Sequence, residues 1–441
     1  MKTRYQFYKD SGVEWIGEIP EHWVVTKVKH CSKIFGRIGF RGYAIEDIVD
    51  EGEGAITLSP GNIVNNNLNL STKTYLSWEK YYESPEIQIF GNDILIVTTG
   101  STIGKSCLIP SETPEMTINP QLIVLKTVKL LNKYLFYQLT CDFIQRRFVN
   151  EQTGSSTPTI SQAKIGSFLL VKPPTLEQTQ IVEFLDEKTS LIDKLISVKQ
   201  RKIELLKEKR TALINHVVTK GLDPNVKMKD SGIEWIGEIP EHWVVKKTTY
   251  CFSLIGSGTT PTSSRSEYYE GGEVNWLQTG DLTDNLITKT SKLITKKALS
   301  DFNLKIYPSN SLIIAMYGAT IGKVGLLKIN TATNQACCVL AEPIGVYINY
   351  VFYWFIANKI RIVSLAYGGG QPNISMETIK FLRIPNPLLS EQTQIVEYLD
   401  EKTKEIDELV SLEQKKIDLL REYRESLISE VVTGKIKVTT R

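Results

Sequence analysis

The sequence lacks a long apolar run, a strong excess of charge of either sign, and a CxxC pair of cysteines. Its start, MKTRYQFYKDSG, has no apolar signal region, and no run approaches the length of a membrane span. We therefore expect a cytoplasmic protein without a membrane partner. The six cysteines include no CxxC pair and no nearby histidine at zinc-ligand spacing. This favours buried, reduced thiols and no structural metal.

Motifs for catalysis are also missing. The sequence has no glycine-rich dinucleotide fingerprint, no paired-carboxylate motif in matching loops and no nucleophile elbow. The segments TTGSTIGKS and MYGATIGKV look like P-loops, but only three residues separate Gly100 from Gly104, and Val324 stands where a magnesium-binding hydroxyl belongs. We interpret both segments as a strand followed by a tight turn, not as an ATP site. These absences indicate a binding protein.

What the sequence does contain is a long repeat. Residues 9–25 read KDSGVEWIGEIPEHWVV, and residues 229–245 read KDSGIEWIGEIPEHWVV. A second shared block starts with EQTQIVEFLDEKT at Glu177 and with EQTQIVEYLDEKT at Glu391. Because 441 residues exceed what one core usually supports, we predict two tandem units, each a domain with an appendage.

The segments between the shared blocks, residues 31–170 and 251–384, align only at islands. A constant frame around two unlike inserts predicts two readers of two different things. The frame also carries His22 and His242, each inside IPEHW and followed by a tryptophan. The tryptophans favour a packing role for these histidines, with proton transfer as the alternative.

Net charge is only +3, so charge as a whole says little about nucleic acid. Basic residues nevertheless gather locally, and such clusters either contact phosphates or form a solvated face. The clusters are Lys27, Lys29, Lys33, Arg37 and Arg41 in the first copy, Lys289, Lys292, Lys296 and Lys297 in the second, and Arg146 with Arg147.

The shared C-terminal block predicts a long helix in each copy. It is a run of 43 residues without Gly or Pro, which as a helix would be roughly 65 Å long. Apolar residues fill most heptad positions a and d, interrupted by Lys199 and Arg210 in the first copy and by Glu413 and Arg424 in the second. We expect the two stripes to pair as a coiled coil; the alternative is that each packs on a globular domain.

Charge decides the predicted direction of this pair. A parallel pair would stack Arg210 on Arg424, which costs energy in a partly buried seam. An antiparallel pair with pseudo-twofold symmetry places opposite charges together: Lys199 with Glu413, Arg210 with Asp400, and Arg424 with Asp186.

Several polar turns lie at matching places in the two inserts. GSSTPTIS starts at Gly154 and GGGQPNIS at Gly368; INPQ ends at Gln121, and TNQA contains Gln335. Such turns present hydrogen-bonding groups to a ligand from a rigid scaffold. Amide side chains can pair with adenine in the major groove or can cap a strand end, and both interpretations stay open.

The motifs WIGEIPEHW, TGSTIGK or YGATIGK, NQACC, GGGQPNIS and EQTQIVEFLDEKT together resemble the specificity (S) subunit of type I restriction–modification systems. The resemblance covers nearly the whole chain, although the first copy has INPQL for NQACC and SSTP for GGQP. It implies two mixed α/β target recognition domains joined by two long antiparallel helices. The domains expected on this basis are residues 1–172 and 223–386, with spacer helices in 173–222 and 387–441.

The resemblance also implies a non-catalytic, DNA-binding role in a bacterial or archaeal cytoplasm. Each recognition domain would read one half of a split, asymmetric target on double-stranded DNA. The helices would set the spacer and dock two modification (methyltransferase) subunits, and restriction subunits would add translocation and cleavage. No cofactor is expected on this chain, whereas S-adenosylmethionine, ATP and Mg are expected on the partner subunits. The alternative is an orphan S-like scaffold that binds a modification subunit without reading DNA.

Candidate DNA-binding residues follow from the matching motifs and from the basic clusters. They are Arg37, Arg41, Ser101, Thr102, Lys105, Asn119, Gln121, Ser155, Ser156, Thr157, Gly258, Thr259, Thr260, Arg265, Tyr317, Lys323, Asn334, Gln335, Gln371 and Asn373.

Overall fold

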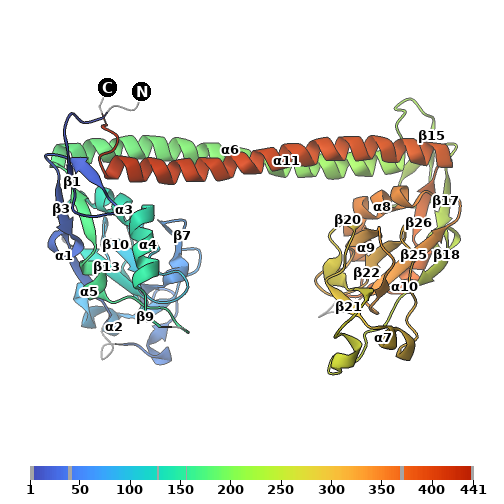
Figure 1. Ribbon diagram of the computed structural model, residues 1–441, viewed down its shortest axis with the longest axis horizontal. Helices are drawn as coiled ribbons and strands as arrows, with labels where there is room; N and C mark the ends of the chain where they lie inside the picture. The colour runs from blue at the N-terminus through green and yellow to red at the C-terminus, as the bar shows by residue number, and fades with distance from the viewer. Residues whose placement is uncertain (1–3, 38–41, 127–128, 155, 368–371, 439–441) are drawn as a thin grey trace. The chain divides into compact units, whose positions relative to one another are not determined.

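The computed structural model describes residues 4–37, 42–126, 129–154, 156–367 and 372–438 (Figure 1). The chain divides into two compact units. Unit 1 contains Met1–Lys199 and Lys415–Arg441, and unit 2 contains Gln200–Gln414. Unit 1 therefore combines both ends of the chain, whereas unit 2 is continuous in sequence.

Unit 1 is built on a four-stranded antiparallel sheet, in the order β11(Ser106–Leu108), β10(Ile94–Val97), β13(Leu122–Lys126) and β4(Lys33–Gly36). Alternate residues of these strands face two different cores, as the two-residue period of a strand requires. Ile94 and Ile96 pack in the core that contains the helices, and Leu95 and Val97 pack in a second core. The sheet is thus buried on both faces, which explains the uniformly apolar sequence ILIV of β10.

A second sheet and two helices cover the two faces. The sheet runs β12(Met116–Ile118), β6(Gly54–Leu58), β9(Tyr75–Ser77) and β5(Ile48–Val49), with β12 parallel to β6. The two helices are α3(Asn132–Thr140) and α4(Asp142–Glu151). Unit 1 also contains the short helices α1(Val28–Cys31), α2(Trp78–Glu83) and α5(Gln162–Gly166), and the hairpin of β7(Ile63–Val64) with β8(Asn67–Leu68).

Unit 2 repeats this plan with five strands in its main sheet and three in its second sheet. Its main sheet runs β18(Phe252–Gly256), β25(Cys337–Pro343), β22(Leu312–Ala315), β23(Val324–Leu327) and β20(Asn285–Ile287). A second sheet runs β21(Lys292–Ile294), β19(Val274–Leu277) and β24(Ala332–Thr333). The helices are α7(Lys296–Asp301), α8(Ile348–Ala357), α9(Lys359–Ser364) and α10(Met376–Phe381).

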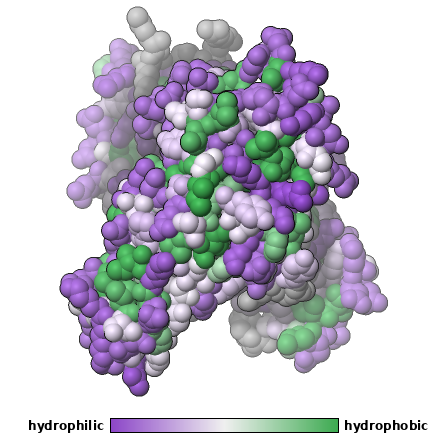
Figure 2. All heavy atoms as spheres, turned by 90° about the vertical axis from the view of Figure 1, so that its right-hand side faces the viewer, coloured by the Kyte–Doolittle hydropathy of each residue, from purple (hydrophilic) through white to green (hydrophobic). Residues whose placement is uncertain are grey.

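Short two-stranded sheets flank the long helices in each unit. In unit 1 these are β1(Tyr8–Asp10) with β2(Glu18–Pro20), and β3(Val24–Lys27) with β14(Leu169–Lys172); in unit 2, β15(Met228–Asp230) with β16(Glu238–Pro240), and β17(Val244–Lys247) with β26(Arg383–Asn386). The surface of unit 2 in Figure 2 mixes hydrophilic residues with small hydrophobic patches, as is usual for protein surfaces.

The two predicted long helices are α6(Thr175–Lys220) and α11(Leu389–Val432). Within each unit one half of α6 runs antiparallel to one half of α11. In unit 1, Arg424 pairs with Asp193 at 3.1 Å, and in unit 2, Arg210 pairs with Asp407 at 3.1 Å. Heptad a and d residues such as Val182, Leu185 and Ile192 are buried in the seam, so the predicted stripe and direction are confirmed.

The predicted partners of the two arginines are corrected by one heptad, from Asp400 to Asp407 and from Asp186 to Asp193. The globular regions engage the carboxylates that were expected to pair with the arginines: Tyr353 donates to Asp400 at 2.6 Å, and Tyr137 donates to Asp186 at 2.6 Å. Each arginine instead pairs with the aspartate that lies one heptad further along the other long helix. Glu413 is buried and pairs with Lys202 at 2.9 Å. Lys199 and Glu413 belong to different units, and their pairing stays a prediction.

The repeated IPEHW motif holds the first turn of each long helix. Glu177 Oε2 accepts hydrogen bonds from Trp23 Nε1 at 3.0 Å and from the Tyr5 hydroxyl at 2.8 Å, and Glu177 Oε1 lies 2.6 Å from His22 Nε2. Glu391 makes the same contacts with His242 and Trp243, at 2.9 and 3.0 Å. Burial alone would raise the pKa of Glu177, but the hydrogen bonds from Tyr5, His22 and Trp23 outweigh burial and lower it. These contacts fit the predicted packing role of the motif.

Each unit also holds the last turn of the other long helix. In unit 1 the Tyr134 hydroxyl donates to Val432 O at 3.0 Å, and in unit 2 the Tyr350 hydroxyl donates to Val218 O at 2.9 Å. All six cysteines are buried with free thiols, as predicted. Among the described residues no group of three potential ligands is placed to hold a metal ion. No helix in this part of the chain is both long and apolar enough to cross a membrane.

Candidate nucleic-acid interface

Backbone hydrogen bonds bring three polar segments of unit 1 together. Thr98 N donates to Gln121 O at 2.8 Å, and Ile160 N donates to Thr98 O at 2.9 Å. Gly100 N donates to Pro158 O at 2.9 Å. We name residues 98–105, 119–121 and 156–160 loop cluster 1.

The corresponding segments of unit 2 meet in the same way. Met316 N donates to Ala336 O at 2.8 Å, and Ile374 N donates to Met316 O at 2.7 Å. A fourth segment joins them, because Gly258 N donates to Asn334 O at 3.3 Å. We name residues 257–261, 316–323, 334–336 and 372–374 loop cluster 2. Two sequences with little similarity thus build one backbone scaffold.

The glycines of the TIGK turns have the backbone conformation of tight turns. Gly100 and Gly104 have φ values of 103° and 87°, and Gly318 and Gly322 have values of 81° and 73°, a region that side chains disfavour. A Cβ at Gly104 would also lie 2.9 Å from the Phe148 ring, so the turn packs against α4. The interpretation as a strand, β10 or β22, followed by a tight turn is confirmed.

Most of the predicted residues of unit 1 lie in loop cluster 1. Exposed members are Ser101, Lys105, Gln121, Ser156 and Thr157, and partly buried members are Thr102 and Asn119. The structure adds Thr99, whose hydroxyl lies 3.2 Å from that of Thr159. No sequence pattern singles out Thr99 beyond its place in the TTG turn.

Arg37 is corrected. It is 8% exposed, and its guanidinium donates to Ile118 O at 3.0 Å and to Thr117 Oγ1 at 3.1 Å. Burial lowers its pKa. The arginine fastens β4 to the end of β12, because a buried charge needs internal hydrogen bonds, so we withdraw it from the candidate DNA contacts. Arg41, Ser155 and Gln371 lie outside the described residues.

Loop cluster 2 contains most of the predicted residues of unit 2. Thr259, Gln335 and Asn373 are exposed, whereas Gly258, Thr260, Tyr317, Lys323 and Asn334 are partly buried. The Thr260 hydroxyl donates to Gln335 Oε1 at 2.6 Å. Asn373 pairs through its backbone with Tyr367 and forms a bridge with Tyr317, which fixes its position.

Residues 257–261 are pinned by side chains that the sequence did not single out. The Tyr307 hydroxyl donates to Ser257 O at 3.0 Å, Trp276 Nε1 donates to Thr259 O at 3.3 Å, and the Tyr269 hydroxyl donates to Pro261 O at 2.5 Å. Burial raises the pKa of Tyr307 to about 12. Gly258 approaches β24 so closely that a Cβ would lie 1.7 Å from Thr333 O. Only glycine fits there, and the segment is held rigidly.

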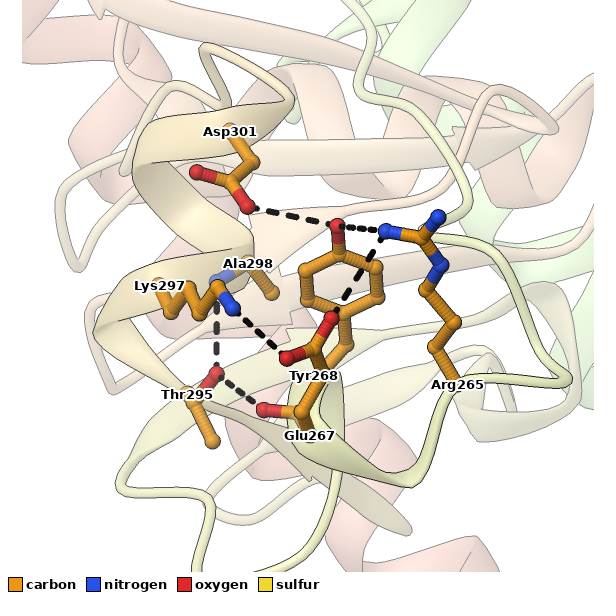
Figure 3. A network of polar contacts seen from close by, with 7 residues as sticks. All are labelled: Arg265, Glu267, Tyr268, Thr295, Lys297, Ala298 and Asp301. Atoms are coloured by element: carbon orange, nitrogen blue, oxygen red, sulfur yellow. Dashed lines mark hydrogen bonds and ion pairs between the residues drawn. The ribbon is translucent and has the colours of Figure 1, made fainter.

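Arg265 lies outside loop cluster 2, in a polar network beside α7 (Figure 3). Its guanidinium lies 3.7 Å from Glu267 and 3.4 Å from the Tyr268 hydroxyl, and Lys297 also pairs with Glu267, at 2.6 Å. The Arg265 side chain is 63% exposed. Exposed ion pairs of this kind break at little cost, so both cations remain available to an anionic partner.

Rigid polar loops on two similar scaffolds define a protein with two separate recognition surfaces. The family model described as "Type I restriction modification DNA specificity domain" matches residues 26–207 and 240–420. The chain therefore belongs to this family.

Similar proteins agree with this membership. A Methanocaldococcus jannaschii protein with the provisional name type I restriction enzyme MjaX specificity subunit is 26% identical over 99% of both chains. The type I restriction enzyme EcoR124I/EcoR124II specificity subunit of Escherichia coli is 24% identical over 51% of each chain. The HsdS subunit from Thermoanaerobacter tengcongensis shares the fold, with a TM-score of 0.52 and 14% identity over 95% of this chain and 98% of that one. A chain from a structure of a type I R-M system gives a TM-score of 0.72 and 15% identity, over 94% and 98%.

Proposed function

We propose that this chain is the DNA sequence-recognition subunit of a type I restriction–modification complex. Loop cluster 1 reads one half of a bipartite, asymmetric target, and loop cluster 2 reads the other. The observation that carries this proposal is the contrast between a shared backbone scaffold and different exposed side chains. In the two TIGK turns, for example, the exposed Ser101 corresponds to the exposed Ala319. A surface that only stabilised the fold would have no need of two chemistries.

The division of labour along the chain follows from the same contrast. Residues 1–172 and 223–386 are the recognition domains, and residues 173–222 and 387–441 carry the spacer helices. The helices set the separation of the two half-sites. Phosphate contacts come from exposed cations, such as Lys105 within loop cluster 1 and Arg265 outside loop cluster 2, and base contacts come from polar side chains within the clusters.

The long helices also supply the docking surface for two methyltransferase subunits. Apolar residues recur on their exposed sides: Leu191, Leu195, Val198, Leu419 and Tyr423 in unit 1, and Leu205, Leu409 and Leu412 in unit 2. Val198 is 66% exposed and Leu419 is 62% exposed. Large apolar side chains at three- and four-residue spacing on an exposed helix face are typical of a protein interface. Restriction subunits, and S-adenosylmethionine, ATP and Mg on the partners, complete the proposed complex.

The test is reconstitution. The purified chain alone should transfer no methyl label from S-adenosylmethionine to DNA, and the chain mixed with its methyltransferase subunit should methylate one split motif. Leu195→Glu with Leu409→Glu should prevent assembly without lowering the melting temperature, whereas Gln200→Glu, an exposed site off the stripe, should not. Methylation by the chain alone would contradict the proposal. An orphan scaffold would assemble with the methyltransferase subunit, but the mixture would not methylate a specific DNA motif.

A further inference from the structure

Each loop cluster holds one glutamine whose side-chain oxygen is already engaged. The Thr260 hydroxyl donates to Gln335 Oε1 at 2.6 Å, and Asn119 Nδ2 donates to Gln121 Oε1 at 3.1 Å. Both glutamines are exposed. Within the described residues neither Nε2 has a hydrogen-bond partner, and that of Gln121 lies over Gly100, 3.9 Å from the position of a Cβ there.

The neighbouring asparagines differ from the glutamines. Asn119 Oδ1 accepts from Gln121 N at 3.0 Å, and Asn334 Oδ1 accepts from Ala336 N at 3.2 Å. Both are Asx turns, in which the side chain stabilises its own backbone. The asparagines therefore shape the turn. The glutamine side chains do not stabilise the turns in this way. Orienting an exposed, flexible side chain costs conformational entropy, and a solvent-exposed hydrogen bond offsets little of that cost.

The glutamines are also not equivalent in the scaffold. Gln121 O accepts from Thr98 N, as Ala336 O accepts from Met316 N, so Gln121 corresponds to Ala336 and Gln335 lies one position earlier. Each copy has oriented a glutamine at a different position and with a different neighbour. Two independent solutions for the same side chain indicate a common ligand chemistry.

We propose that Gln121 and Gln335 are specificity-determining residues that each read one adenine in the major groove. An amide oxygen has two lone pairs, so Oε1 can accept from adenine N6 while it keeps its internal hydrogen bond. Nε2 then donates to adenine N7, which gives the bidentate pairing of glutamine with adenine. Thr260 and Asn119 are positioning residues, because they orient the amide before DNA arrives.

This inference rests on the proposed function, so the experiment uses the chain assembled with its methyltransferase subunits and its mapped target motif. Each adenine of the motif is replaced in turn by 7-deazaadenine, which lacks N7, and duplex affinity is measured by competition. For the wild-type complex, 7-deazaadenine at one adenine of the half-site that unit 2 reads should lower the affinity about 10-fold. The Gln335→Ala complex should bind the normal duplex with about 10-fold lower affinity than wild type. Replacing that adenine by 7-deazaadenine should lower the affinity of this variant no further. Gln121→Ala should behave in the same way in the other half-site.

Two controls separate reading from folding. Gln6→Ala removes an exposed amide outside both clusters and should leave every affinity unchanged. Thr260→Val should weaken binding about 3-fold at the Gln335 adenine alone, and Thr260→Ser should restore it, an outcome that a general loss of stability would not give. If Gln335→Ala and each 7-deazaadenine substitution act additively, the inference is overturned. If the wild-type complex binds motif and scrambled duplexes equally, the proposed function itself fails.

Discussion

At the scale of single residues, Glu177 and Glu391 matter most for the fold. Each lies in the first turn of a long helix, where a negative charge also interacts favourably with the helix dipole. Each accepts from a buried tryptophan, Trp23 or Trp243, both with no measurable exposure. The IPEHW motif is therefore a joint between a globular region and a helix.

Glu177→Ala should lower the free energy of unfolding by about 2 kcal/mol, because it leaves Trp23 Nε1 and the Tyr5 hydroxyl without their acceptor. Glu204→Ala, an exposed glutamate of the same helix, should change it by less than about 0.5 kcal/mol. Denaturant unfolding followed by tryptophan fluorescence measures both. Equal effects of the two substitutions would show that the joint is not needed.

The pH dependence of the same site has a defined sign. Since hydrogen bonding lowers the folded-state pKa of Glu177, its stabilising contribution is complete above the unfolded value of about 4.3 and is lost as pH falls through the lower folded-state pKa. The difference in melting temperature between wild type and Glu177→Gln should therefore be constant near neutral pH and shrink below about pH 4. A difference that grew on acidification would contradict this assignment.

Residue by residue, sequence motifs located the loops but not the role of each side chain. The islands around Gln121, Gln335 and Asn373 do lie within the two clusters. Arg37 is buried and not part of the surface, because its side chain bonds to β12, which follows it by about 80 residues in the sequence. Trp276 and Tyr307 were missed for the same reason: a pinning contact between distant strands leaves no local pattern.

At the scale of elements, the helix seam was predictable because it is periodic. Stripe, length and direction follow from the heptads and charges, whereas the ion-pair partners depend on Tyr137 and Tyr353 of the globular regions. The seam contains one buried carboxylate, Glu413, which is 2% exposed. Buried charges of this kind are costly to leave unpaired.

Glu413→Lys should destabilise unit 2 by about 3 kcal/mol, because it places a second cation beside Lys202 in a buried seam. Combining it with Lys202→Glu should restore part of this loss, and a double-mutant cycle from thermal unfolding gives the coupling energy. Glu422→Lys, an exposed position of α11, is the matched control and should be nearly neutral. Additive single and double variants would rule out this pairing.

At the scale of the whole molecule, the two inserts are predicted to be interchangeable modules. Replacing residues 251–384 by the matching insert of a related chain should change one half of the methylated motif and leave the other half intact, because loop cluster 1 is untouched. Sequencing of methylated DNA from the reconstituted enzyme reads both halves. A change in both halves would show that the clusters do not read independently.

The composition of unit 1 from both ends of the chain has a consequence for biosynthesis. Its core includes Leu427, Ile428 and Val431, so the first 199 residues leave the ribosome long before the segment that completes them. Unit 2 is continuous and can finish first. A chain that stops after Gln414 should accordingly exchange amide hydrogens rapidly in β10 and β13 but slowly in β22 and β25. A late premature stop codon would thus damage the recognition region that is translated first.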